Sequence, residues 1–115
     1  MTVSLGESRD LILKWKNEST PILVTVDSDD GFTFKFSGSI AELFPHGFVM
    51  VRYTAQPKMC ADLTVIMLDA SSFEYQDLRE APQETQEKFE GTILGILAFK
   101  LKGSTIVLYE LQSRS

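Results

Sequence analysis

The sequence has very few of the residues from which disulfides, metal sites and nucleophilic active sites are usually built. Its 115 residues include one cysteine, Cys60, and one histidine, His46. A single cysteine cannot form a disulfide within the chain, and this usage is typical of proteins in a reducing cytoplasm. No other cysteine or histidine stands at metal-ligand spacing, so we expect no metal site and no cofactor.

The chain also lacks a membrane span, a secretory signal and a basic character. No run approaches the about 18 apolar residues of a spanning helix, and no basic region followed by an apolar core stands at the N-terminus. Lysine and arginine number 11 against 16 aspartates and glutamates, which gives a net charge of −5 and a pI of about 4.8. Such a balance repels a phosphate backbone, so nucleic acid is not the expected partner. We expect a cytoplasmic protein without membrane contact.

What the sequence does contain is a β pattern, and it is clearest in residues 93–111. Lys102 and Gly103 separate two apolar runs, and glycine supplies the positive φ that a tight hairpin turn needs. Both faces of the hairpin are apolar, so we expect it to lie centrally in a sheet or to be covered on both sides. Four cross-strand pairs are predicted: Phe99 with Ile106, Leu97 with Leu108, Ala98 with Val107, and Ile96 with Tyr109.

A helix is predicted near the N-terminus. Ser4 and Glu7 have the spacing of a capping box, in which each side chain bonds a backbone N–H at the helix start. Pro21 excludes helical backbone just before it and so limits the helix. One apolar helix face is predicted, formed by Leu11, Ile12 and Trp15, with Trp15 as a core anchor.

Alternating apolar residues predict four further strands, at residues 22–27, 32–40, 48–53 and 61–69. Gly38 interrupts the apolar row of the second strand and predicts a bulge or a sharp bend. The strand at 61–69 is expected to be buried, with Leu63, Val65 and Met67 on one face.

Together these elements predict a mainly β fold in a single domain, residues 1–115. We expect a small, strongly bent antiparallel barrel of five to six strands with an N-terminal helix. A short second helix over 82–90 is one interpretation, because Pro82 suits the first helical position and Gly91 a C-terminal stop. The other interpretation runs residues 88–90 directly into the hairpin strand.

The least regular segment is 73–82, F-E-Y-Q-D-L-R-E-A-P, which shows neither strand nor helix periodicity. A polar loop that carries aromatic residues is a common place for a binding site. In the alternative interpretation, Phe73 and Tyr75 pack under the barrel and Arg79 pairs with a nearby acid, Glu74, Asp77 or Glu80. The candidate binding residues are Phe73, Glu74, Tyr75, Asp77, Arg79 and Glu80, together with His46.

Residues 74–90 also hold most of the negative charge. Six acids against two bases give this stretch a net charge of −4 out of −5. Such a surface usually serves solubility, and it can also dock a basic partner.

The capped helix followed by five or six short, bent strands resembles the Sm and SH3-like small β-barrels. F-E-Y-Q-D-L-R-E-A-P, with the terminal V-L-Y-E-L, is similar to uncharacterised small bacterial proteins over about residues 72–111. That similarity implies no activity. Sm-like proteins form rings that bind RNA, so the first resemblance implies a ring and an RNA site. The acidic composition and the absence of Sm-type motifs depart from that pattern.

No motif for catalysis is present: there is no G-x-S-x-G nucleophile turn. We therefore expect a non-catalytic interaction or regulatory module. It would bind a protein partner or self-assemble, through an exposed strand edge or through the acidic segment 74–90. The alternative is a small-molecule-binding or hydrolytic domain that uses the barrel mouth near His46 and residues 73–79. An RNA-binding ring is the third hypothesis.

Overall fold

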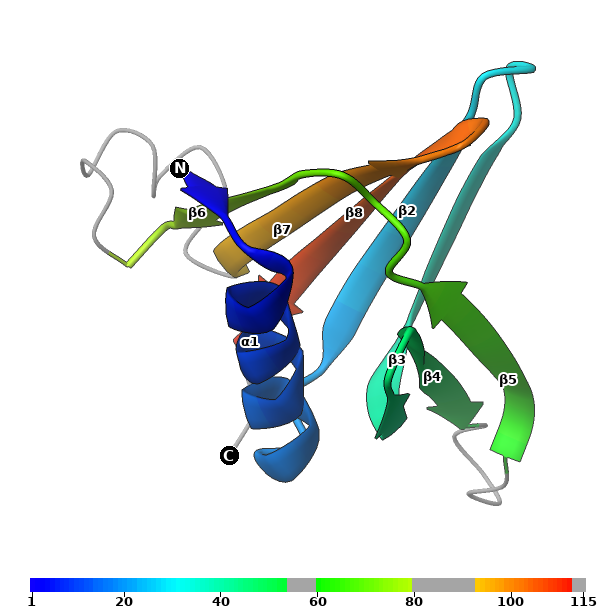
Figure 1. Cartoon of the computed structure of the whole chain (residues 1–115). Helices are drawn as coiled ribbons and strands as arrows, with labels where there is room; N and C mark the ends of the chain where they lie inside the picture. Colours follow the sequence, from blue (N-terminus) through cyan, green and yellow to red (C-terminus); the bar gives the residue numbers. More distant parts are fainter. Residues whose placement is uncertain (54–59, 80–92, 113–115) are drawn as a thin grey trace.

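The computed structural model describes residues 1–53, 60–79 and 93–112, which form one antiparallel sheet and one helix (Figure 1). The sheet order is β1-β6-β7-β8-β2-β3-β4-β5. The mainly β, antiparallel prediction with an N-terminal helix is confirmed. The elements are β1 (Thr2–Val3), α1 (Leu5–Asn17), β2 (Ile22–Ser28), β3 (Thr33–Phe44), β4 (Gly47–Tyr53), β5 (Cys60–Met67), β6 (Phe73–Asp77), β7 (Ile93–Leu101) and β8 (Ser104–Leu111).

In the described part of the chain, the sheet is not closed into a barrel and has eight strands rather than five or six, so this part of the prediction was wrong. The sheet ends at β1 and β5, and no ladder within the described residues joins these two strands. One missed strand, β1, has only two residues. The other, β6, was taken for an irregular loop, although Phe73 and Tyr75 point inward while Glu74 and Gln76 are exposed. The helix considered for 82–90 lies outside the described residues.

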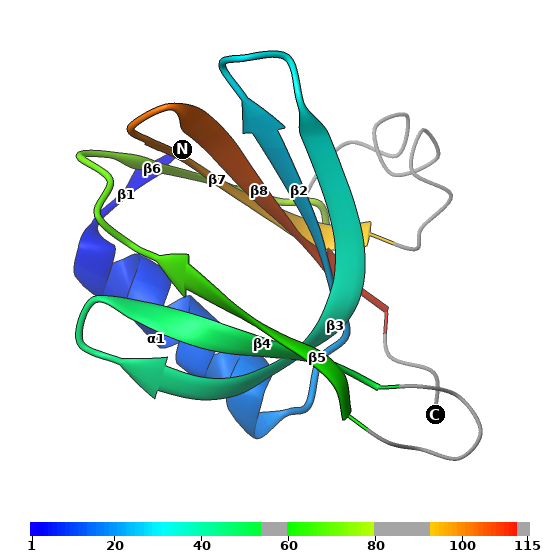
Figure 2. The same ribbon diagram turned by 90° about the vertical axis from the view of Figure 1, so that its right-hand side faces the viewer.

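The sheet bends along β3, which runs through both of its halves (Figure 2). The first part of β3, up to Gly38, pairs with β2, and the part from Ser39 onward pairs with β4. A side chain at position 38 would bring its Cβ within 2.3 Å of the Val51 carbonyl oxygen, so glycine permits the close approach at this corner. The bulge lies slightly later than predicted, between Ile40 and Glu42.

Helix α1 lies inside the bend and packs against β3, with β4 and β5 in front of it in Figure 2. The predicted capping box is confirmed: the Glu7 N–H donates to Ser4 Oγ at 3.0 Å, and the Ser4 N–H donates to a Glu7 carboxylate oxygen at 3.1 Å. Ile12 and Trp15 are fully buried, as predicted for the apolar face. Within the described ranges, no helix is long and apolar enough to cross a membrane.

The β7–β8 hairpin lies in the middle of the five strands on the other side of the bend, between β6 and β2. All four predicted cross-strand pairs are present, from Phe99 with Ile106 to Ile96 with Tyr109. Phe99 and Ile106 are buried on the inner face, while Ile96 and Tyr109 are half-buried on the outer face. The central position of the hairpin is therefore confirmed.

Strand β5 corrects a further prediction, because its apolar row is exposed rather than buried. Leu63 is 64% exposed, Val65 58% and Met67 37%. They share one face, as predicted, but Ile66 on the opposite face is the residue that enters the core, at 5% exposure. Strand β5 is the last strand of the sheet and has β4 as its one neighbour among the described strands, and its row is exposed because no described element covers that face of the strand.

Candidate functional site

Three of the predicted site residues lie together at the end of β6. Arg79 follows β6 after a turn and reaches Glu110 near the end of β8. Its guanidinium donates two hydrogen bonds to that carboxylate, Nη1 to Oε2 at 2.9 Å and Nη2 to Oε1 at 3.1 Å. Asp77 Oδ1 accepts from the Arg79 backbone N–H at 3.0 Å and from Nε at 3.2 Å. We call Tyr75, Asp77, Arg79 and Glu110 the Arg79 cluster.

Backbone pairing and a glycine make room for the Arg79 cluster. Asp77 lies opposite Gly95 on β7, and Gly95 lies opposite Glu110 on β8. A Cβ at position 95 would stand 2.6 Å from the Tyr75 hydroxyl oxygen and 3.0 Å from Glu110 Oε1. Glycine therefore allows the phenol and the carboxylate to occupy the inner face beside β7.

In the Arg79 cluster, one positive charge is held between two carboxylates, those of Glu110 and Asp77. The Glu110 side chain is 4% exposed, and a buried carboxylate needs hydrogen bonds of this kind to remain charged. Hydrogen bonding to Glu110 raises the pKa of Arg79 further above its ordinary value. Burial, followed by the negative charges of Glu110 and Asp77, raises the pKa of Tyr75. Near neutral pH Arg79 thus stays charged and Tyr75 stays neutral, so neither group is suited to proton transfer.

The other predicted site residues are separate from this cluster. Phe73 is a core residue and packs against Phe99, with ring centroids 5.2 Å apart. Glu74 points to the outer face and accepts a hydrogen bond of 2.8 Å from the Thr2 hydroxyl. His46 is exposed in the turn between β3 and β4, and its imidazole forms no hydrogen bond or ion pair with the described residues. Glu80 lies outside the described residues.

Glu110 was missed by the sequence interpretation, although a signal was present. Ile106, Leu108 and Glu110 alternate along β8, and the predicted hairpin already placed the first two on one face with Phe99 and Leu97. An acid that continues a buried apolar row requires a cationic partner. The alternative interpretation, in which Arg79 pairs with a nearby acid, is confirmed for Asp77. It did not include Glu110, which is the second carboxylate bound by Arg79.

The second feature of functional interest is the edge of the sheet at β5. Leu63 and Val65 face outward beside Val51 and Val49 of β4, and Met67 continues the row beside Gly47. No described strand pairs with the outer side of β5, so the backbone N–H and C=O groups that point away from β4 have no ladder. We call the outward row of Leu63, Val65 and Met67, together with this free backbone, the β5 edge.

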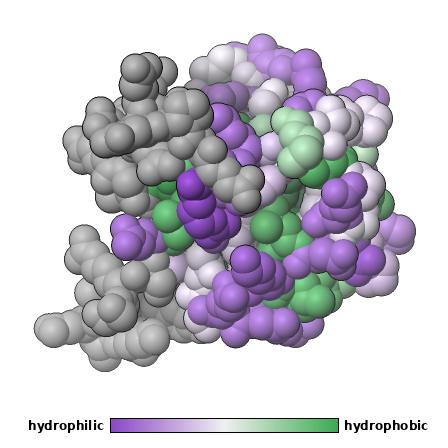
Figure 3. Space-filling view, turned by 90° about the vertical axis from the view of Figure 1, so that its left-hand side faces the viewer, coloured by the Kyte–Doolittle hydropathy of each residue, from purple (hydrophilic) through white to green (hydrophobic). Residues whose placement is uncertain are grey.

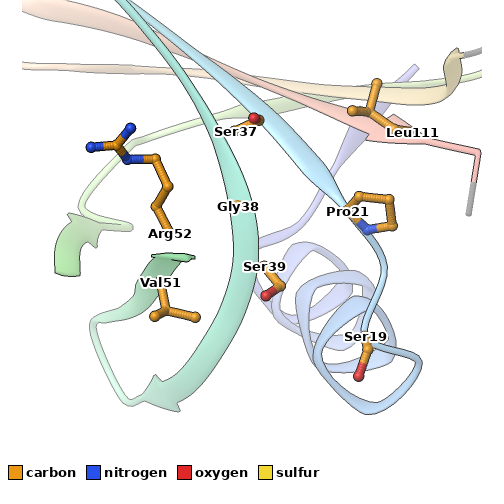
Figure 4. Close-up of a pocket in the computed structure, with 8 residues that line it drawn as sticks. All are labelled: Ser19, Pro21, Ser37, Gly38, Ser39, Val51, Arg52 and Leu111. Atoms are coloured by element: carbon orange, nitrogen blue, oxygen red, sulfur yellow. The ribbon is translucent and has the colours of Figure 1, made fainter. Parts of the chain in front are cut away.

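Near the β5 edge, Arg52 of β4 and Asp62 of β5 form an exposed ion pair. Arg52 Nη2 and Nε donate to Asp62 Oδ2 at 2.6 Å and 3.0 Å. Arg52 also borders an open hollow of about 520 Å³ at the bend of the sheet, where three serines contribute hydroxyl groups (Figure 4). The charge of Arg52 is already matched by Asp62, so the hollow has no unmatched cation to attract an anion.

The face on the other side of the molecule mixes polar and apolar side chains (Figure 3). A shallow groove of about 340 Å³ lies between α1 and the start of the chain, with Val3, Leu11 and Tyr75 beside Asp10 and Lys14. The described residues contain no group of three or more His, Cys, Asp or Glu side chains placed so that they could hold a metal ion.

The described residues form an open, bent antiparallel sheet around one helix. One half of the sheet holds the ion pair between Arg79 and the buried carboxylate of Glu110, and the other half ends in the exposed apolar row of the β5 edge. The chain matches no protein-family model, no curated protein and no solved structure.

Proposed function

We propose that the protein is a non-catalytic interaction module that binds its partner along the β5 edge. The observation that supports this proposal is the combination, on one strand, of an edge that no described strand pairs with and three exposed apolar side chains. A strand added to such an edge forms main-chain hydrogen bonds for affinity, while its side chains meet the apolar row for specificity.

The β5 edge lacks the features that usually prevent such pairing. Edge strands are commonly protected by lysine, proline or an inward-pointing charge. The sequence of β5, C-A-D-L-T-V-I-M, contains no lysine and no proline. Its one charged residue, Asp62, is paired with Arg52. An edge of this length without protection is expected either to aggregate or to have a partner.

The acidic segment 74–90 receives less support as the binding surface. Of its acids, Glu74 and Asp77 lie within the described residues, and both are engaged: Glu74 by Thr2 and Asp77 by Arg79. The guanidinium of Arg79 is bonded to Glu110 and Asp77, so its charge is already matched within the chain rather than offered to a partner.

A site-specific cross-linking experiment tests the proposal. The photoreactive residue p-benzoylphenylalanine replaces Val65 in one variant and Leu13 in a control, because Leu13 is also an exposed apolar side chain, on α1, at 40% exposure. Irradiation of cells that produce each variant should give a discrete adduct at position 65 and none at position 13. Absence of any adduct at position 65 would reject the β5 edge as the binding surface.

A further inference from the structure

We infer that the partner on the β5 edge is a second copy of this chain, paired antiparallel about a two-fold axis at Val65. This inference depends on the proposed function, because it assigns an occupant to the same edge. The two sheets would then continue into one another across the pair of β5 strands.

In a two-fold interface, β5 would pair with an antiparallel copy of itself, so its residues must fit the same residues in reverse order. The side chains of β5 meet this requirement. With Val65 opposite Val65 of the second copy, Leu63 lies opposite Met67 and Thr64 opposite Ile66. The outer row therefore becomes six apolar side chains without interruption. Cross-strand apolar pairs of this kind stabilise antiparallel sheets.

Charge favours the same arrangement. Two chains that each carry a net charge of −5 repel one another unless their acids are kept apart. In this register Asp62 lies opposite Leu68 rather than opposite an acid, and its charge is matched within its own chain by Arg52. The acids of β6 stand at the far end of the sheet order from β5. The contact is therefore free of opposed like charges.

The other edge of the sheet cannot serve as well. Strand β1 has two residues, so a head-to-tail contact between β5 and β1 offers a very short ladder. In the register centred on Val65, residues 63–67 of β5 pair with the same five residues of the second copy, which is a longer ladder than β1 can offer. A β5–β5 contact also closes after two copies, whereas a head-to-tail contact would require a ring of several copies or an open filament.

A charge-swap experiment tests the inference. Wild type, Val65→Lys and Val65→Glu are examined separately by sedimentation velocity over a concentration series, with Leu13→Lys as the matched control on α1. We expect dimers for wild type and Leu13→Lys. Each Val65 variant places two like charges opposite one another, which should raise the dimer Kd by about tenfold or more. An equimolar mixture of the two variants should form the heterodimer again.

The equimolar mixture separates a loss of dimerisation from a loss of folding. A variant that is monomeric because it is misfolded would not form a heterodimer when the other variant is added. A monomeric wild type would overturn the inference. Unchanged dimerisation of both Val65→Lys and Val65→Glu would overturn it too, and so would an equimolar mixture of the two variants that stays monomeric. If wild type is monomeric but position 65 cross-links to a different protein, the proposed function stands and only the second copy is rejected. If position 65 gives no adduct at all, both fail.

Discussion

In the described part of the chain, each half of the bent sheet contains an arginine that is ion-paired with a carboxylate on a strand, Arg79 with Glu110 and Arg52 with Asp62, and these two contacts differ in burial. In the half formed by β6, β7 and β8, Arg79 binds Glu110, whose side chain is 4% exposed. In the half formed by β4 and β5, the side chains of Arg52 and Asp62 are 54% and 45% exposed. The first pair bonds β8 to the turn after β6, while the second joins two neighbouring strands at the surface.

The difference in burial indicates that the two ion pairs have different roles, one in the stability of the fold and one beside the proposed binding edge. A buried carboxylate depends on its partner, since removing one member leaves the other without compensation in a medium of low polarity. An exposed pair contributes little to stability. What the exposed pair does is neutralise an acid beside the apolar row of Leu63, Val65 and Met67. The β6–β8 half is thus expected to hold the fold, and the β4–β5 half to meet the partner.

The largest expected effect comes from Glu110→Gln. The amide keeps the shape of the side chain but removes the charge, so Arg79 loses a two-pronged ionic contact. Because Arg79 itself is partly solvated, we expect a loss of about 2–3 kcal/mol in the free energy of unfolding. Urea titration measures it. The control, Glu74→Gln, removes an exposed carboxylate from β6 and should change the free energy of unfolding little. Equal losses in the two variants would refute a stabilising role of the Arg79–Glu110 contact.

A smaller effect is expected from Tyr75 at alkaline pH. The pKa of Tyr75 is raised in the folded protein, first by burial and then by Glu110 and Asp77. Below about pH 10 the phenol is neutral in both states and favours neither. As the pH rises further, the unfolded chain releases this proton more readily, so stability falls until the pH passes the raised folded pKa.

Tyr75→Phe should remove this part of the alkaline loss. The measurement is the free energy of unfolding between about pH 9 and pH 11, for wild type, Tyr75→Phe and Tyr109→Phe. Tyr109 is the control because its side chain lies on the outer face of β8, opposite to the face that carries the Glu110 side chain. If Tyr75→Phe leaves the pH dependence of the free energy of unfolding unchanged, ionisation of Tyr75 does not contribute to the alkaline loss of stability.

The parts of the fold that could be predicted from the sequence are those set by neighbouring residues. Gly103 and the alternation around it determine the register of the β7–β8 hairpin, and Ser4 with Glu7 determines the start of α1. Both signals lie within a few residues of the structure they specify. The link from Arg79 to Glu110 spans 31 residues and depends on β6, β7 and β8 lying side by side.

The exposure of β5 could not be predicted for a related reason. Leu63, Val65 and Met67 alternate in the same way whether or not another layer covers them. What decides is whether another part of the molecule covers that face of β5, and this depends on the arrangement of the whole sheet rather than on the residues of β5. The candidate site was therefore half predicted: Tyr75, Asp77 and Arg79 meet, while the proposed binding edge was expected to be core.

The smallest expected effect comes from Asp62→Asn, and it completes the comparison between the two ion pairs. The exposed Arg52 guanidinium can be solvated by water when the carboxylate charge is lost, so the melting temperature should stay within error of wild type. Thermal unfolding at low and at high salt checks this, because screening should further reduce any difference. A loss as large as that of Glu110→Gln would mean that the β5 edge is held by its charges, and the division between a stabilising half and a binding half would fail. An unchanged melting temperature would leave the apolar row as the feature of β5 that a partner must recognise.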